Sequence, residues 1–277
     1  MSLTVHEDLE QGSGDWLAAR CGVITASTIG RLITVAAPGP QHYDCPECHA
    51  AVSDPCTSKS TKSAAPIRAY HAGRADIARL YASDAPPVLT VADSDTSRAL
   101  LRTLAAERIT SNVEGIFVNY DMQRGTDDEP YARDEYAAWA KVKVDEVGFM
   151  VREESGIRLG YSPDGLVGDD GLIEIKSRRQ PRQLETILNG DVPTENLAQI
   201  HAGMWVSDRT WCDYISYRDG MHLYVKRVRR DPLWDKAIEE AATHAEQVIT
   251  QLVTTYTERV KDFPHIEKRP DLDDITF

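Results

Sequence analysis

Residues near the middle of the chain have the types and spacing for divalent-metal chemistry. In the stretch GYSPDGLVGDDGLIEIKSRR (160–179), a Pro-Asp pair ends at Asp164, and Glu-Ile-Lys follows after nine further residues. Side chains alternate along a strand, so Glu174 and Lys176 share one face. The turn GDDG (168–171) predicts a tight hairpin that brings Asp164 beside Glu174.

Two carboxylates and a neighbouring carbonyl form an oxygen cluster that suits Mg²⁺ or Mn²⁺. We expect Asp164, Glu174 and the backbone carbonyl of Ile175 to supply it. Such an ion polarises a phosphodiester and lowers the pKa of bound water, while Lys176 can orient the attacking water or stabilise the developing charge. The alternative is a surface strand with a Glu–Lys pair and an ordinary turn Asp.

A second candidate metal site lies in a cysteine-rich segment. Three cysteines fall within twelve residues, and a reducing compartment favours metal binding over disulfides. Three thiolates and one imidazole suit tetrahedral zinc, which would also stabilise a segment with little apolar material. The expected ligands are Cys45, Cys48, Cys56 and His71. His42 and His49 are rival ligands, and a loop with reduced cysteines is the alternative. Cys21 and Cys212 are expected to be core residues.

Composition describes a soluble protein with a core of its own. The 277 residues are 42% hydrophobic and 27% charged, which allows one domain with a small insertion. No apolar run approaches the roughly 18 to 20 residues of a membrane helix, and the N-terminus does not resemble a signal peptide. We therefore expect a cytoplasmic protein without a membrane partner.

Net charge alone argues against a nucleic-acid partner, because phosphate binding depends on Lys and Arg. The formal charge is −13. Electrostatic fields are local, however, and a basic groove can lie on an acidic body. The segments KSRRQPR (176–182) and VKRVRR (225–230) are locally basic.

The expected elements are helices around a mixed sheet, so the fold class is α/β (α+β). A helix, a Gly break and a second helix are expected over residues 14–33, and a helix starting near Met122 or after Gly125 precedes three antiparallel strands over 146–178. A helix at 195–208, a hairpin turning at Asp219-Gly220 and a long helix from Pro232 follow. Residues 36–87 differ in composition and are predicted to be an inserted module that ends in a helix at 66–81.

Four stretches, taken together, resemble a known family. The Asp164–Lys176 core looks like the PD-(D/E)XK nuclease motif, and the chain is similar to the YqaJ-type viral recombinase family, the lambda-exonuclease-like group. The matching stretches are WLAARCGVITAS (16–27), MQRGTDDEPYARDEY (122–136), the SPDGL…EIK core and NLAQIHAGMWV (196–206). The resemblance implies a restriction-endonuclease-like core in a single domain over residues 1–277.

The resemblance also implies roles for further residues. Glu129 would be an additional acidic residue at the metal site, and Gln199 would hold the metal-bound water or the scissile phosphate. Arg20 and Ser27 would contact the 5′-terminal phosphate of DNA, which suits the planar fork of Arg. Trp16 is expected in the core.

The activity that the family implies is metal-dependent 5′ to 3′ digestion of linear duplex DNA. The product would be a 3′ single strand for an annealing partner, and the enzyme would be a ring of identical subunits, commonly three. The cysteine segment resembles small zinc-binding modules of actinobacterial and phage proteins, which are regarded as nucleic-acid-binding. The alternatives are a structure-specific or restriction-type endonuclease and a non-catalytic DNA-binding subunit.

Overall fold

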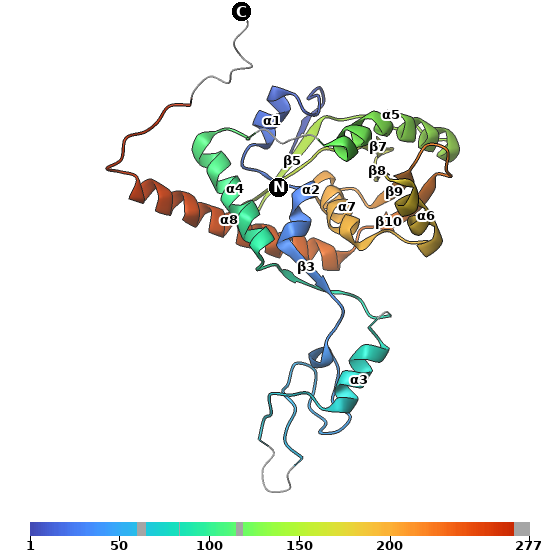
Figure 1. Ribbon diagram of the computed structural model, residues 1–277, viewed down its shortest axis with the longest axis vertical. Coiled ribbons are helices and arrows are strands. Elements are labelled where there is room, and N and C mark those ends of the chain that lie inside the picture. The colour runs from blue at the N-terminus through green and yellow to red at the C-terminus, as the bar shows by residue number, and fades with distance from the viewer. Residues whose placement is uncertain (60–64, 83, 115–118, 269–277) are drawn as a thin grey trace, which may run out of the picture.

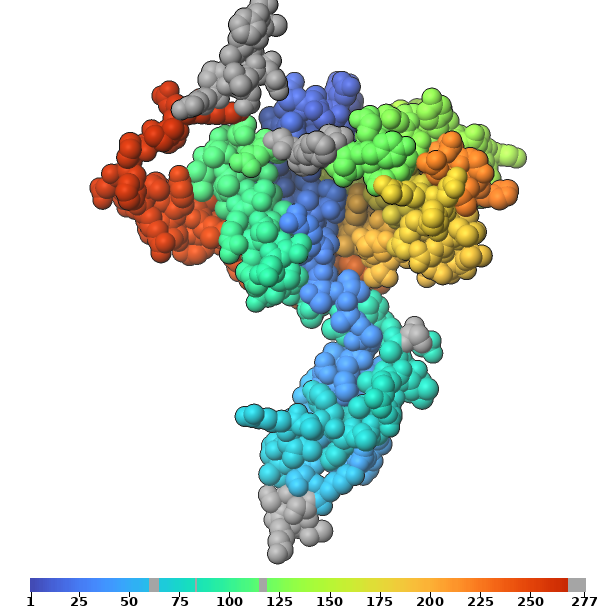
Figure 2. Space-filling view, in the orientation of Figure 1, coloured from blue at the N-terminus to red at the C-terminus, as the bar shows by residue number. Residues whose placement is uncertain are grey.

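The computed structural model describes residues 1–59, 65–82, 84–114 and 119–268. Helices and two sheets form the body of the molecule, and the cysteine-rich segment projects from one end of it (Figure 1). The space-filling view shows the same projection joined to the body by a narrow neck (Figure 2). In the described residues, no helix is both long and apolar enough to cross a membrane.

Two four-stranded sheets form the centre of the body, and each contains one parallel pair. The first sheet has the order β1 (Ser2–His6), β5 (Phe149–Glu154), β6 (Ile157–Tyr161) and β2 (Ile24–Thr25). The second has the order β10 (Tyr224–Arg229), β9 (Trp211–Tyr217), β8 (Gly171–Ser177) and β7 (Gly165–Val167). The predicted α+β class is confirmed, but the single mixed sheet is divided into two.

The described body also contains seven α-helices. They are α1 (Gly14–Arg20), α2 (Ala26–Ile29), α4 (Asp95–Thr110), α5 (Tyr120–Ala140), α6 (Gln180–Asn189), α7 (Thr194–Ser207) and α8 (Pro232–Arg259). Helix α7 contacts strands of both sheets as well as α8, and its apolar residues Ile200, Met204 and Trp205 are buried in the main core. Helix α7 is therefore the element that joins the two sheets.

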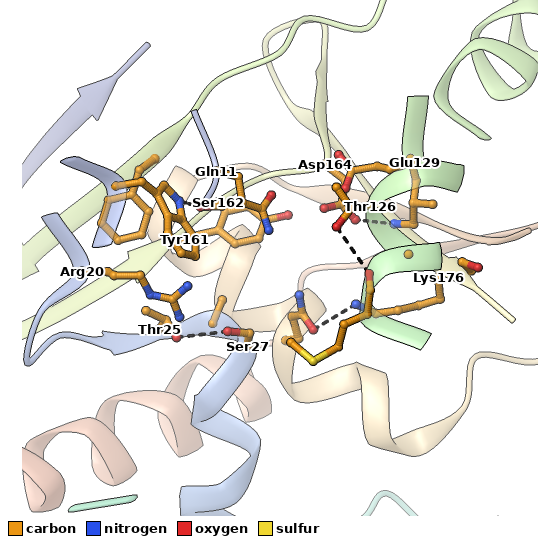
Figure 3. A pocket seen from close by; sticks show the side chains of 18 of the residues that line it. Gln11, Arg20, Thr25, Ser27, Thr126, Glu129, Tyr161, Ser162, Asp164 and Lys176 are labelled. Atoms are coloured by element: carbon orange, nitrogen blue, oxygen red, sulfur yellow. Dashed lines mark hydrogen bonds between the residues drawn. The ribbon is translucent and has the colours of Figure 1, made fainter. Parts of the chain in front are cut away.

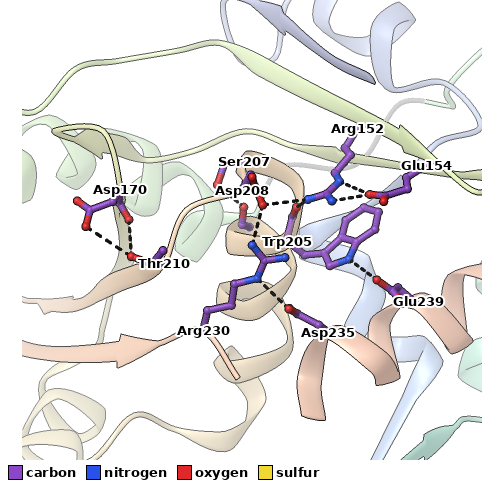
Figure 4. A network of polar contacts seen from close by, with 11 residues as sticks. Arg152, Glu154, Asp170, Trp205, Ser207, Asp208, Thr210, Arg230, Asp235 and Glu239 are labelled. Carbon is purple, nitrogen blue, oxygen red and sulfur yellow. Dashed lines mark hydrogen bonds and ion pairs between the residues drawn. The ribbon is translucent and has the colours of Figure 1, made fainter. Parts of the chain in front are cut away.

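A polar network fixes α7 against its neighbours (Figure 4). Arg230 donates to Asp208 at the end of α7 and to Asp235 at the start of α8, both at 2.8 Å. The indole of Trp205 donates to Glu239 on α8 at 3.0 Å. These contacts hold the helix that also carries Gln199.

The hairpin predicted at GDDG is present and joins β7 to β8. Gly165 pairs with Ile173, and a β-carbon at Gly165 would lie 2.3 Å from Val144, so the close approach requires glycine. Arg209 donates to the carbonyls of Gly168 and Gly171, each at 2.7 Å. These hydrogen bonds fix the start of β8, the strand that carries Glu174 and Lys176.

A two-stranded ribbon leads to the cysteine-rich module. Strands β3 (Ile33–Ala36) and β4 (Val88–Val91) pair antiparallel, so the chain leaves and re-enters the body at one point. The division into a domain and a 36–87 insertion stays a prediction. The helix expected at 66–81 is wrong in extent, because α3 spans only Ala72–Leu80. The segment predicted as the first helical turn is not helical, because the Ile67 N–H donates to the carbonyl of Cys56, eleven residues earlier, at 2.8 Å.

Three other expectations differ from the structure. The region predicted to hold three antiparallel strands holds four, β5 to β8, because each sheet takes one hairpin. Helix α5 starts at Tyr120, earlier than expected, since the Asn119 side chain accepts from the N–H of Met122 at 3.0 Å. Strand β1 and helix α6 were not predicted.

Candidate active site

Asp164 and Lys176 of β8 line one end of a cleft, and the buried Glu174 of the same strand pairs with Lys176. The Lys176 ammonium lies 2.5 Å from Glu174 Oε1, so the two side chains share a strand face as alternation predicts. Asp164 accepts a hydrogen bond of 2.6 Å from the Ile175 N–H. Burial and the Glu174 charge hold the pKa of Asp164 well above its usual range. Burial would lower the pKa of Lys176, but the charges of Glu174 and Asp164 raise it.

The Glu174 carboxylate has the environment of a cation ligand. Its side chain is 0% exposed, and Oε1 forms an ion pair with the Lys176 ammonium at 2.5 Å. The other oxygen, Oε2, is buried without a hydrogen-bond partner among the described residues. Buried carboxylates require a compensating charge, and oxygen donors suit Mg²⁺ or Mn²⁺. Asp164 and Glu174 thus fit a divalent ion; the role of the Ile175 carbonyl stays a prediction.

Two helices bring the remaining polar groups to this end. Glu129 of α5 lies close enough to Glu174 and Lys176 for their charges to act on it. Burial is the main cause of the raised pKa of Glu129, and Arg133 opposes it. Gln199 of α7 accepts a 3.2 Å hydrogen bond from the Lys176 ammonium. The Gln199 amide is therefore tied to the amine that lies nearest the carboxylates.

The opposite end of the cleft is cationic. The Arg20 guanidinium lies 4.1 Å from the centre of the Trp16 ring, and burial lowers the pKa of Arg20. The Trp16 indole donates to Ser162 Oγ at 2.9 Å, two residues before Asp164. Trp16 is buried, as predicted for a core residue, but it also lines the cleft.

Ser27 lies beside Arg20, although not at the start of a long helix. Helix α2 has four residues, and its N-cap is Thr25, the residue that precedes it. The hydroxyls of Ser27 and Thr25 lie 3.1 Å apart, and both residues line the cleft. A pair of hydroxyls beside a guanidinium can donate to a phosphate.

The two ends belong to one cleft of about 400 Å³. Figure 3 shows Arg20, Thr25 and Ser27 on one side and Asp164, Glu129 and Lys176 on the other. Glu174 does not line the cleft and its Oε1 pairs with Lys176, so the ammonium and an ion would compete for its carboxylate. A cleft with a cation at one end and acidic groups at the other can bind an anion at the first and a divalent ion at the second.

The sequence did not single out three residues of this region. Ser162 and Gln11 line the cleft, and Arg133 contacts both Glu129 and the Asp164 carbonyl. Ser162 and Arg133 lie inside the quoted motifs. Their closeness in sequence to Asp164 and to Glu129, respectively, could have identified them as site residues. Gln11 carried no signal, because it belongs to an irregular N-terminal segment.

The module holds a second cluster. Ligand atoms of four side chains lie within 4.8 Å of one another, and they are those of Cys45, Cys48, Cys56 and His71. His71 immediately precedes α3, and its Nδ1 lies 3.4 Å from Cys45 Sγ. A compact set of three sulfurs and one nitrogen fits tetrahedral zinc. The rivals are elsewhere: His42 bonds locally to Gly39, and His49 is outside the cluster.

A backbone hydrogen bond acidifies one of the thiols, whereas burial acts on another in the opposite direction. The N–H of Thr57 points to Cys48 Sγ at 3.5 Å and is the main cause of a Cys48 pKa of about 6. Burial instead raises the pKa of Cys45. A buried thiol beside an acidic one favours a site in which a metal replaces both protons.

Comparison with known proteins finds two family models that match parts of the chain. A model described as a YqaJ-like viral recombinase domain matches residues 70–210, and one described as a putative DNA-binding phage zinc finger domain matches residues 13–92. No curated protein matched the chain.

Two solved structures have the same fold. The alkaline exonuclease LHK-Exo from Laribacter hongkongensis is 24% identical, with a TM-score of 0.63 over 91% of this chain and 100% of that one. LHK-Exo in complex with dAMP matches over the same shares at 24% identity and a TM-score of 0.62. Since the family model matches half of its residues, the chain belongs to the YqaJ-like viral recombinase domain family.

Proposed function

We propose that the protein is a phage-type DNA exonuclease that hydrolyses phosphodiesters with Mg²⁺ or Mn²⁺. The observation that carries the proposal is the buried Glu174 carboxylate near Asp164, whose Oε1 pairs with the Lys176 ammonium while Oε2 has no hydrogen-bond partner among the described residues. A structural ion pair alone does not account for it, because a buried carboxylate normally has its lone pairs satisfied. A non-catalytic subunit would have no reason to maintain such a group.

Asp164 and Glu174 would hold the ion, with Glu129 as an additional acidic ligand. When bound, the ion polarises the scissile phosphate and acidifies its water. Lys176 would donate to the charge that develops on the phosphate oxygens, and Gln199 would orient the Lys176 ammonium through their 3.2 Å hydrogen bond.

Arg20 and Ser27 would bind the terminal 5′-phosphate at the cationic end of the cleft. Occupation of that end requires a free strand terminus, so digestion would run from 5′ to 3′ on linear duplex DNA. The 3′ strand that remains would pass to a single-strand annealing protein. We further propose a ring of identical chains in the host cytoplasm, with zinc on the Cys45–His71 cluster.

A comparison of linear and covalently closed DNA tests the proposal. In Mg²⁺, a linear duplex should be degraded and a closed plasmid should persist, whereas cutting of the plasmid would indicate an endonuclease. Glu174→Ala should lower the rate by about 10³-fold or more while DNA binding in Ca²⁺ is kept. Glu153→Ala, at an exposed acid of β5, is the matched control. Full activity of Glu174→Ala would refute the assignment.

A further inference from the structure

Arg133 links the two halves of the acidic cluster. We propose that Arg133 is a positioning residue, which holds Asp164 and Glu129 in the arrangement that accepts the divalent ion. This inference rests on the proposed function and adds a residue to it.

The guanidinium of Arg133 makes three contacts in three directions. Its Nε donates to the backbone carbonyl of Asp164 at 2.8 Å, across 31 residues of sequence. Its Nη2 donates to Glu129 Oε1 at 2.6 Å, one helical turn earlier on α5. Its Nη1 lies 2.6 Å from Glu146 Oε2. One planar group thus ties helix α5 to the turn that precedes β7.

The surroundings distinguish this arrangement from a helix-surface ion pair. Exposed pairs four residues apart contribute little to stability and leave both side chains free to move. The Arg133 side chain is 12% exposed and the Glu129 side chain 24% exposed, while Glu146 is 70% exposed. Arg133 is therefore fixed at its inner contacts, and its outer contact with Glu146 is open to solvent.

The contact with Glu129 has a consequence for ion binding. Oε1 of Glu129 accepts from Arg133, so Oε2 is the oxygen left to face an ion. Carboxylate ligands commonly need such a hydrogen-bonded support, and its loss typically costs 10- to 100-fold in metal affinity. Arg133 also offsets part of the repulsion among Asp164, Glu174 and Glu129, which would otherwise push the three acids apart.

Binding of Mn²⁺ to the DNA-free protein tests the inference independently of catalysis. Arg133→Gln should weaken Mn²⁺ binding, followed by electron paramagnetic resonance, by about 10- to 100-fold. Single-turnover cleavage of linear DNA should then need correspondingly more Mg²⁺, with the KM for DNA little changed. Arg133→Lys keeps the positive charge but lacks the planar, multidentate guanidinium, so it should retain part of the Mn²⁺ affinity that Arg133→Gln loses.

Glu146→Gln is the matched control, because it removes only the exposed outer contact and should bind Mn²⁺ within about 2-fold of the unmodified protein. Wild-type Mn²⁺ affinity in Arg133→Gln would overturn the inference and leave the proposed function standing. If Arg133→Gln does not fold, the Lys variant decides: Mn²⁺ affinity equal to that of the unmodified protein overturns the inference. An unmodified protein that neither binds Mn²⁺ nor degrades linear DNA overturns both.

Discussion

The guanidinium of Arg20 lies on the face of an indole in the cleft, and this placement suits an anionic ligand. The Trp16 ring, 4.1 Å away, fixes the position of the group, and burial lowers the pKa of Arg20. A charge-assisted hydrogen bond contributes about 1.5 to 3 kcal/mol, or roughly a factor of 10 to 100 in affinity. In the proposed function, Arg20 would discriminate a phosphorylated strand end from a hydroxyl end.

Arg20→Ala should reduce the preference for 5′-phosphorylated over 5′-hydroxyl ends by about 10-fold or more. The ratio of initial rates on two otherwise identical duplexes measures it, and each variant is its own control for folding. Arg20→Lys should retain part of the preference, since the charge remains but the fork is lost. An unchanged ratio in Arg20→Ala would remove Arg20 from end recognition.

At the residue scale, the sequence predicted the positions of side chains that depend on local backbone geometry. It did not predict positions that depend on tertiary contacts. Glu174 and Lys176 share a face because strand alternation requires it, and the GDDG turn brought Asp164 close. Arg133 was not predicted as a site residue, because its contact with the Asp164 carbonyl depends on the packing of α5 beside β7. The roles assigned to Glu129 and Gln199 stay predictions.

At the element scale, one buried arginine organises the zinc module. Arg74 of α3 is 0% exposed and donates to the carbonyls of Tyr43, Ala51 and Asp54 at 2.7 to 2.8 Å. It also lies 3.6 Å from Cys56 Sγ. Three thiolates, one neutral imidazole and Zn²⁺ carry a formal charge of −1, so a buried guanidinium is the complement that the site needs.

Purified protein should contain about one zinc per chain, and Arg74→Met should lower the zinc affinity by about 10- to 100-fold. Competition with a chromophoric chelator measures the affinity under reducing conditions. Arg79→Met lies on the same helix at an exposed residue and is the matched control. Purified protein without zinc would contradict this account of the module. So would an Arg74→Met variant with the same zinc affinity as Arg79→Met.

A histidine in α7 gives the body a dependence of stability on pH. Burial lowers the pKa of His201 to about 4, against the opposing charge of Asp231. Its ring stacks on Trp234 at 5.0 Å, and no donor or acceptor among the described residues reaches Nδ1. The folded chain therefore keeps the ring neutral, whereas the unfolded chain protonates it near pH 6.5.

The stability contribution of neutral His201 is present above pH 6.5 and is lost as the pH falls toward 4. The loss amounts to about 3 kcal/mol at most. His201→Phe keeps the ring stack and should reduce the dependence of the free energy of unfolding on pH between 6.5 and 4, measured by urea unfolding. His244→Gln, at an exposed residue of α8, should leave the slope as in the unmodified protein. Equal slopes in all three proteins would exclude His201 as the cause.

Prediction of the elements succeeded for strongly patterned segments. The long helix from Pro232 and the hairpin at Asp219-Gly220 have clear capping and turn residues, and both are present. Helix α6 was missed because its start, Arg179-Gln180-Pro181, lacks a capping side chain and carries basic residues. The division into two sheets could not be predicted, because strand order depends on contacts between distant segments.

At the scale of the whole molecule, the charge of −13 must be reconciled with a polyanionic substrate. An acidic monomer would repel DNA over most of its surface, whereas in a closed ring only the channel lining has to be basic. A closed ring also retains DNA that is threaded through its channel, even when the affinity of each chain for DNA is low. Processive digestion and oligomeric state are therefore coupled in this proposal, and one set of measurements addresses both.

Light scattering at concentrations where the protein is active should give a mass of about three chains of 30.9 kDa each. Once digestion of a labelled duplex has begun, a large excess of unlabelled linear DNA should not stop it, because the threaded strand cannot leave. Raising the salt concentration should slow initiation more than elongation, since only the encounter relies on screened charges. A monomeric mass together with immediate arrest by the competitor would exclude the ring while leaving the hydrolytic site unaffected.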